Sequence, residues 1–203
     1  METQPKEPLF NIPPLTMWIA IFLILIFGVL QIQSVFELIV PLLCFVPESF
    51  TQHPLQHSYT LLSYALLHFG WPHIATNIAG LLAFGSGVER LLGRKWFTVI
   101  FVAGTIFGAL GHWALFPHGT DPLGGASAGI SALFGAVLPL LVKRRDLIMA
   151  NIVFILTNLA IGLMGVPNEP GMSIAWQAHI VGFILGQIIV FFILKKISQT
   201  EHE

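Results

Sequence analysis

Six long apolar stretches are the feature that most constrains this chain. They comprise residues 15–31, 73–92, 96–116, 127–142, 147–165 and 174–194. A helix that crosses a bilayer needs about 20 mostly apolar residues, within a range of about 17–25. Only 9% of the 203 residues are charged, and a typical soluble domain has about 25%. The sequence therefore predicts an all-α, polytopic membrane protein with six transmembrane helices.

The first predicted outer loop, residues 32–72, contains a shorter apolar segment. Residues 35–46 carry a glutamate and a central proline, and about a dozen residues are too few to cross a bilayer. We expect this segment to lie in the membrane interface or to re-enter the bilayer without crossing it. The chain is thus divided into an N-terminal tail, 1–14, one membrane domain, 15–196, and a C-terminal tail, 197–203.

The lysines and arginines lie almost entirely on one predicted face. Eight of the nine lie at the end of the second, fourth or sixth span or just after it: Arg90, Arg94, Lys95, Lys143, Arg144, Arg145, Lys195 and Lys196. The positive-inside rule makes this face cytoplasmic, and six spans place both termini there. We expect the first apolar stretch to be a retained span and not a cleaved signal peptide. A bacterial plasma (inner) membrane fits best, and a mitochondrial inner membrane stays open.

Charge and composition argue against several functions. Nine Lys and Arg against ten Asp and Glu give a formal net charge of -1, which leaves no basic surface for nucleic acid. The single cysteine, Cys44, excludes an internal disulfide and a cysteine-based metal site. The spans contain neither a charge pathway nor an inverted repeat, as a transporter or channel would need. His68, His73, His112 and His179 do not form facing pairs for haem, and we predict no cofactor and no metal.

A few polar residues lie within the predicted spans at similar heights. Ser127 precedes Lys143 by 16 residues, and His179 precedes Lys195 by 16 residues. At about 1.5 Å per residue, each lies ~24 Å above the basic residues of the cytoplasmic face. His73 and Asn77 of the second span fall at comparable heights. Because polar groups are costly in hydrocarbon, these residues are functional candidates.

The spacing of small residues indicates which spans touch. Two sets recur at every fourth position: Ser127, Ser131 and Gly135, and Ala178, Gly182 and Gly186. Such stripes allow close approach of membrane helices, and facing stripes would bring Ser127 to His179.

A neutral imidazole can activate a serine hydroxyl. Gly124 and Gly125 place Ser127 at a helix N-terminus, where backbone N–H groups favour an anion. With no intramembrane carboxylate to orient His179, the sequence predicts a Ser–His dyad.

Four motifs together resemble the rhomboid intramembrane serine proteases. They are HFGWPHIATN at residues 68–77, GSGVERLLG at 85–93, GGASAGISALFG at 124–135 and AHIVGFILG at 178–186. The resemblance extends from about residue 59 to residue 194. It implies a six-transmembrane-helix rhomboid-like bundle. The implied reaction is hydrolysis of a peptide bond in or near the transmembrane segment of a partner protein.

The resemblance also implies a role for each matching residue. Ser127 would be the nucleophile and His179 the general base, while His73, Asn77 and the Ser127 backbone N–H would form the oxyanion hole. His68, Gly125, Gly182 and Gly186 would support the site. The fifth loop, residues 166–173, would cap it, and the site would open to the extracytoplasmic side. The partners would be transmembrane protein substrates and the lipid bilayer.

The sequence departs from the family pattern at three places. Ala128 follows the serine where the family usually has glycine, and Ser131 stands where many members place an aromatic residue against the base. Tyr59 and Thr60 replace the Trp-Arg pair of the first loop. These departures leave one alternative function open, a non-catalytic rhomboid-like protein that binds membrane helices.

Overall fold

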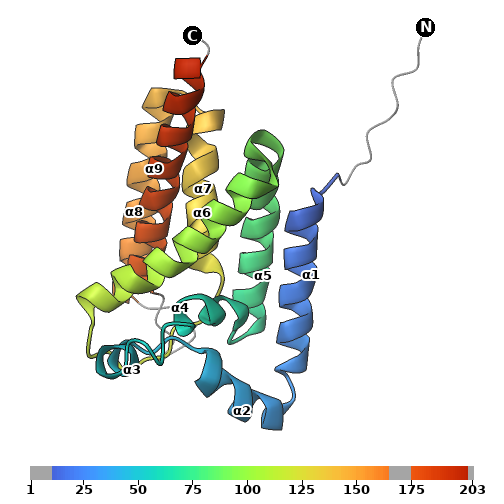
Figure 1. Ribbon diagram of the computed structural model, residues 1–203, viewed down its shortest axis with the longest axis vertical. Coiled ribbons are helices and arrows are strands. Elements are labelled where there is room, and N and C mark those ends of the chain that lie inside the picture. Colours follow the sequence, from blue (N-terminus) through green and yellow to red (C-terminus); the bar gives the residue numbers. More distant parts are fainter. Residues whose placement is uncertain (1–10, 165–174, 201–203) are drawn as a thin grey trace, which may run out of the picture.

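The computed structural model describes residues 11–164 and 175–200, and this part of the chain is almost entirely helical (Figure 1). The elements in chain order are α1 Pro14–Val29, α2 Gln33–Leu43, α3 Pro47–Gln52, α4 Thr60–Ser63, η1 Tyr64–Leu66, α5 Trp71–Gly80, η2 Leu81–Gly85, α6 Ser86–Leu115, α7 Ser127–Leu141, α8 Arg144–Met164 and α9 Trp176–Thr200. The described residues pair as β-structure only in an isolated bridge between Phe45 and Leu123. The all-α fold class is confirmed.

The long helices lie close to the predicted spans. Three helical stretches are long and apolar enough to cross a membrane: Trp71–Leu115, Arg144–Met164 and Trp176–Gln199. The first of these joins α5, η2 and α6, and it folds back on itself at Gly93. The apolar helices α1 and α7 have only 16 and 15 residues, which is below the usual spanning length. The protein is therefore an integral membrane protein, and its six spans remain a prediction.

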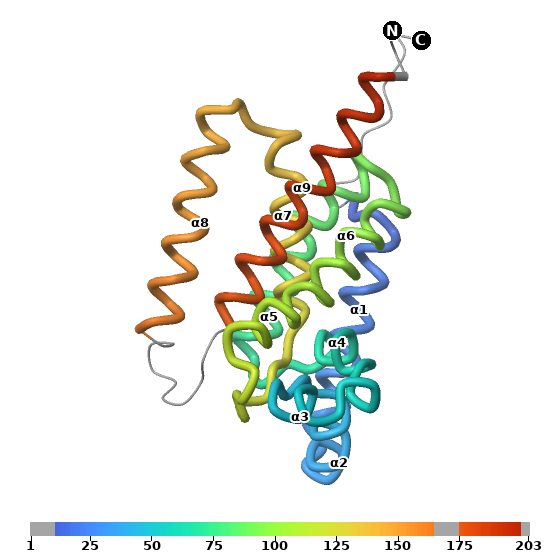
Figure 2. Tube along the Cα trace, turned by 60° about the vertical axis from the view of Figure 1, so that its left-hand side comes forward, coloured from blue at the N-terminus to red at the C-terminus, as the bar shows by residue number. Residues whose placement is uncertain are grey.

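Helix α7 lies at the centre of the bundle. Ten of its 15 residues are buried, and it contacts α5, η2, α6, α8 and α9. Helix α8 is the opposite case, because none of its residues is buried. Figure 2 shows α8 at the edge of the bundle, with α9 and α7 on its inner side. Several neighbouring elements thus hold α7 in place, whereas few elements contact α8.

Glycines of α9 let its backbone touch that of α7. A Cβ atom on Gly182 would lie 2.3 Å from the carbonyl oxygen of Ala128, and one on Gly186 would lie 1.9 Å from that of Ala132. The two small-residue stripes do meet, but the glycines of α9 face the residue after each serine. On α7 the residues that meet these glycines are therefore one position after the serines of the predicted stripe.

The segment before α7 is held by the first outer loop. Phe45 and Leu123 exchange two backbone hydrogen bonds, of 3.2 and 2.8 Å. The Thr51 hydroxyl donates to the Pro117 carbonyl at 2.6 Å. The short apolar segment of this loop forms α2, whose 11 residues are too few to cross a bilayer. The loop therefore braces the backbone that leads to Ser127.

The buried carboxylate of Glu89 caps the N-terminus of α1. It accepts hydrogen bonds from the backbone N–H groups of Leu15 and Thr16, at 3.0 and 2.8 Å, and from the Thr16 hydroxyl at 2.9 Å. The first N–H groups of a helix have no partner within the helix, and the preceding residue, Pro13, provides no side-chain cap. A residue 74 positions along the chain thus supplies the missing acceptor.

Replacing Glu89 by glutamine should therefore lower stability. The new amide nitrogen cannot accept from the helix N–H groups, and an unsatisfied buried polar group costs about 1–3 kcal/mol. Thermal unfolding of the purified protein in detergent should show a lower midpoint. The matched control is Glu37→Gln, at an exposed glutamate of α2 that contacts Gln33. Equal midpoints for the two variants would contradict this role of Glu89.

Candidate active site

The side chains of Ser127 and His179 meet where α7 and α9 begin. The Nε2 atom of His179 lies 2.7 Å from the Oγ atom of Ser127. Ser127 is the first residue of α7, and His179 lies in the first turn of α9. Both side chains are half-buried. The geometry is that of a nucleophile within hydrogen-bonding distance of a base.

The second ring nitrogen of His179 contacts an asparagine. Its Nδ1 atom lies 2.8 Å from the Oδ1 atom of Asn158 on α8. Asn158 was not among the candidate residues of the sequence analysis. The height argument applied to Ser127 could have found it, because Asn158 follows Lys143 by 15 residues and so lies about 22 Å from the same reference residue.

The ring of His73 lies beside the backbone that precedes the serine. Gly125 has a φ of +112°, and a Cβ there would lie 2.5 Å from the Nε2 atom of His73 and 3.7 Å from the Ser127 Oγ. A side chain at this position would therefore be strained and would collide with the imidazole. The backbone N–H of Phe69 points at His73 Nδ1, 3.4 Å away. This contact favours the tautomer with a proton on Nε2, so the hydrogen faces the Gly125–Ser127 region.

Asn77 lies one turn further along α5 and is 5% exposed. Its amide nitrogen donates to the His73 carbonyl at 2.9 Å, which leaves one amide hydrogen for another acceptor. Its Oδ1 atom has no hydrogen-bond partner among the described residues. Asn77 therefore braces the turn that carries His73, and it retains a donor.

The ring of His68 packs against that of His73. The two ring centroids lie 5.0 Å apart, and His68 is 2% exposed. Neither ring nitrogen of His68 has a hydrogen-bond partner within residues 11–164 and 175–200. The structure thus brings His68, His73 and Asn77 together at the start of α5.

Two further predictions concern the surroundings of the base. The predicted cap, residues 166–173, lies outside the described residues. Ser131 places no aromatic side chain against the base, and the ring of Trp176 lies against Gly162 of α8, where a Cβ would be 2.0 Å from Cδ1. A hydrogen bond to Asn158 holds the His179 ring instead. Over the described residues, no group of three His, Cys, Asp or Glu side chains could hold a metal ion.

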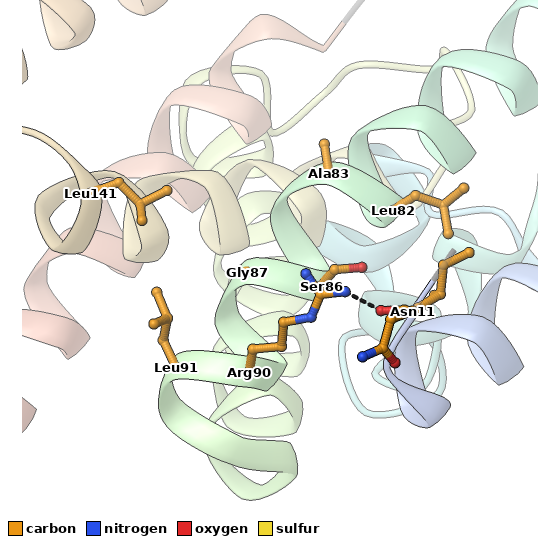
Figure 3. Close-up of a pocket in the computed structure, with 9 residues that line it drawn as sticks. Asn11, Leu82, Ala83, Ser86, Gly87, Arg90, Leu91 and Leu141 are labelled. Carbon is orange, nitrogen blue, oxygen red and sulfur yellow. Dashed lines mark hydrogen bonds between the residues drawn. The ribbon is translucent and has the colours of Figure 1, made fainter. Parts of the chain in front are cut away.

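A cavity of about 470 Å³ lies at the other end of α7 (Figure 3). Arg90 lines it and donates a hydrogen bond to the backbone carbonyl of Asn11. Leu141, the last residue of α7, also lines it. The 14 residues that separate Leu141 from Ser127 correspond to about 21 Å of helix. This cavity is therefore remote from the Ser127–His179 pair.

Comparison with known proteins identifies the family of this chain. The sequence model of the Rhomboid domain matches residues 55–196. The chain belongs to the rhomboid family. It is 31% identical over 142 residues to the rhomboid relative YdcA of Bacillus subtilis, covering 67% of each chain. It is 31% identical over 184 residues to the rhomboid protease GlpG of Pectobacterium atrosepticum, covering 88% of this chain and 62% of that protein.

A third rhomboid relative is much longer than this chain. The rhomboid protease GluP of Bacillus subtilis is 33% identical over 107 residues. The match covers 50% of this chain and only 20% of GluP. The relatives that are similar in sequence to this chain thus differ greatly in total length.

Proposed function

We propose that this rhomboid protein is an intramembrane serine protease. It hydrolyses a peptide bond in or near the transmembrane segment of single-pass membrane proteins. The observation that carries the proposal is the 2.7 Å contact between Ser127 Oγ and His179 Nε2 at the N-terminus of α7. Membership of the rhomboid family and similarity to named rhomboid proteases support it.

The proposed reaction is acyl transfer in two steps. Ser127 Oγ attacks the carbonyl carbon of the substrate while His179 Nε2 accepts the hydroxyl proton. The tetrahedral intermediate collapses, the C–N bond breaks, and His179 returns the proton to the leaving amine. His179 then accepts a proton from the water that attacks the acyl-enzyme. The C–O bond to Ser127 breaks, His179 returns the proton to the Ser127 oxygen, and the carboxylic acid product leaves.

Several donors surround the position where the oxyanion would form. The free N–H groups at the start of α7, including that of Ser127, carry the positive end of the helix dipole. The Nε2–H of His73 faces the same region across Gly125. The remaining amide hydrogen of Asn77 is the third proposed donor. Donors fixed by the fold stabilise the charge that develops in the transition state.

The proposed location follows from the distribution of positive charge. Both termini lie in the cytoplasm, and the pair opens toward the extracytoplasmic side of a bacterial plasma membrane. The substrate reaches Ser127 laterally, from the bilayer. No cofactor takes part, because the nucleophile, the base and the donors belong to the chain.

A fluorophosphonate probe tests the proposal directly. Wild-type protein in liposomes should react with the probe, and mass spectrometry should locate the adduct on Ser127. The same preparation should cleave a generic single-pass transmembrane substrate and lose that activity after labelling. Ser131→Ala is the matched control, because Ser131 is the other serine of α7 and is 8% exposed. It should label normally.

The opposite result has a clear meaning. A folded protein that neither reacts with the probe nor cleaves the substrate would contradict the proposal. It would support the non-catalytic alternative, in which the same bundle binds membrane helices.

A further inference from the structure

Asn158 makes two hydrogen bonds that together define its orientation. Its Nδ2 atom donates to the backbone carbonyl of Phe154 at 2.9 Å. Its Oδ1 atom lies 2.8 Å from Nδ1 of His179. Because the amide nitrogen is committed to a carbonyl acceptor, the atom that faces the imidazole is the oxygen. An amide oxygen only accepts, so Nδ1 must carry the proton.

This contact determines which nitrogen of His179 is basic. A neutral imidazole carries one proton, and a proton on Nδ1 leaves the lone pair on Nε2. Nε2 is the atom that lies 2.7 Å from the Ser127 hydroxyl. Asn158 therefore selects the tautomer in which His179 can accept the serine proton. In Ser–His–Asp enzymes a carboxylate performs this orienting task.

The helix that carries Asn158 has few other attachments. No residue of α8 is buried. Asn151 and Gln187 of α9 form a reciprocal pair of side-chain hydrogen bonds, at 3.3 and 2.7 Å. The rings of Phe154 and Phe183 stack with centroids 4.1 Å apart. The position of Asn158, and with it the orientation of the base, depends on these contacts between α8 and α9.

We infer that Asn158 is a positioning residue that completes a Ser127–His179–Asn158 hydrogen-bonded chain. This inference rests on the proposed protease function. In this arrangement α8, a helix at the edge of the bundle, holds His179 in its active tautomer. The Ser–His dyad by itself includes no residue that orients the base.

The test compares two asparagines of the same helix. Asn158→Leu removes the acceptor, whereas Asn158→Asp keeps an oxygen at the same place. Asn151→Leu breaks a different polar link between α8 and α9, the one to Gln187, and leaves the His179 contact in place, so it is the matched control. The measurements are kcat and KM for a transmembrane substrate in liposomes, and the rate of fluorophosphonate labelling.

We expect Asn158→Leu to lower kcat and the labelling rate by about 100-fold or more, as for a general base in the wrong proton state. KM should change by less than about twofold, because the residue does not contact substrate. Asn158→Asp should recover most of the lost rate. Asn151→Leu should retain a kcat close to that of the wild type, since it leaves the His179 contact in place.

Three outcomes would overturn the inference. The first is a wild-type kcat for Asn158→Leu, and the second is an equal fall for Asn151→Leu, which would mean that Asn158 only secures α8. The third is the absence of recovery in a folded Asn158→Asp protein. Failure of the proposed function looks different, because the wild type itself would then neither cleave nor react with the probe.

Discussion

Replacing Ser127 or His179 by alanine should lower kcat by about 10⁴-fold or more, and replacing both should cost little beyond either single change. A nucleophile and its base act as a unit, so that once one is lost the other contributes almost nothing. The 2.7 Å contact between the two side chains is the physical reason to expect this. The measurement is kcat for the two single variants and the double variant, in the same liposomes as the wild type.

Two further results would separate the two roles. Ser127→Ala should abolish fluorophosphonate labelling because the attacking oxygen is gone, whereas His179→Ala should slow labelling without removing its site. The wild-type rate should fall as the solution becomes acidic, because an imidazolium ion cannot accept the serine proton. Losses in the two single variants that multiply in the double variant would show that the residues act independently.

Replacing Gly186 by valine should prevent α7 and α9 from docking. The first atom of the new side chain would lie 1.9 Å from the Ala132 carbonyl oxygen and 2.8 Å from its carbon. Both are backbone atoms of a buried helix and cannot rotate away. Overpacking of this kind costs about 3 kcal/mol. The helices must separate, and the Ser127–His179 contact is lost with their docking.

The matched control is a valine at Gly28. This glycine lies on an exposed face of α1, and a Cβ there meets nothing within 4 Å. Gly28→Val should therefore leave the unfolding midpoint and the cleavage rate near those of the wild type, while Gly186→Val lowers both. Equal behaviour of the two variants would mean that the close approach of α7 and α9 does not limit stability.

Much of the fold could be predicted because hydropathy and charge are local properties. The apolar stretches locate the long helices to within a few residues. Counting residues from the basic ends gave the heights of Ser127 and His179, which lie on different helices yet meet in the structure. The family resemblance assigned His68 and His73 to the same expected site, and the structure places them together at the start of α5.

The remaining contacts depend on rotations and crossings that a sequence does not specify. A helical pattern gives the height of Asn158 but not the direction in which it points, and that direction decides whether it reaches His179. The capping of α1 by Glu89 joins residues more than 70 positions apart, so no local signal reveals it. The stripe on α7 was displaced by one residue for the same reason, because neighbouring positions differ by only about 100° around a helix axis.

Different segments brace the two members of the Ser127–His179 pair: the first outer loop braces the segment before α7, and α8 contacts the imidazole. The backbone that leads to Ser127 is fastened through Leu123 and Pro117 to the loop that we expect to lie in the membrane interface. His179 contacts Asn158 of α8, a helix in which no residue is buried. Under the proposed roles, a change in bilayer thickness or lateral pressure acts first on the base and leaves the nucleophile in place. The surrounding lipid would then set the rate of this enzyme without altering the groups that carry out the reaction.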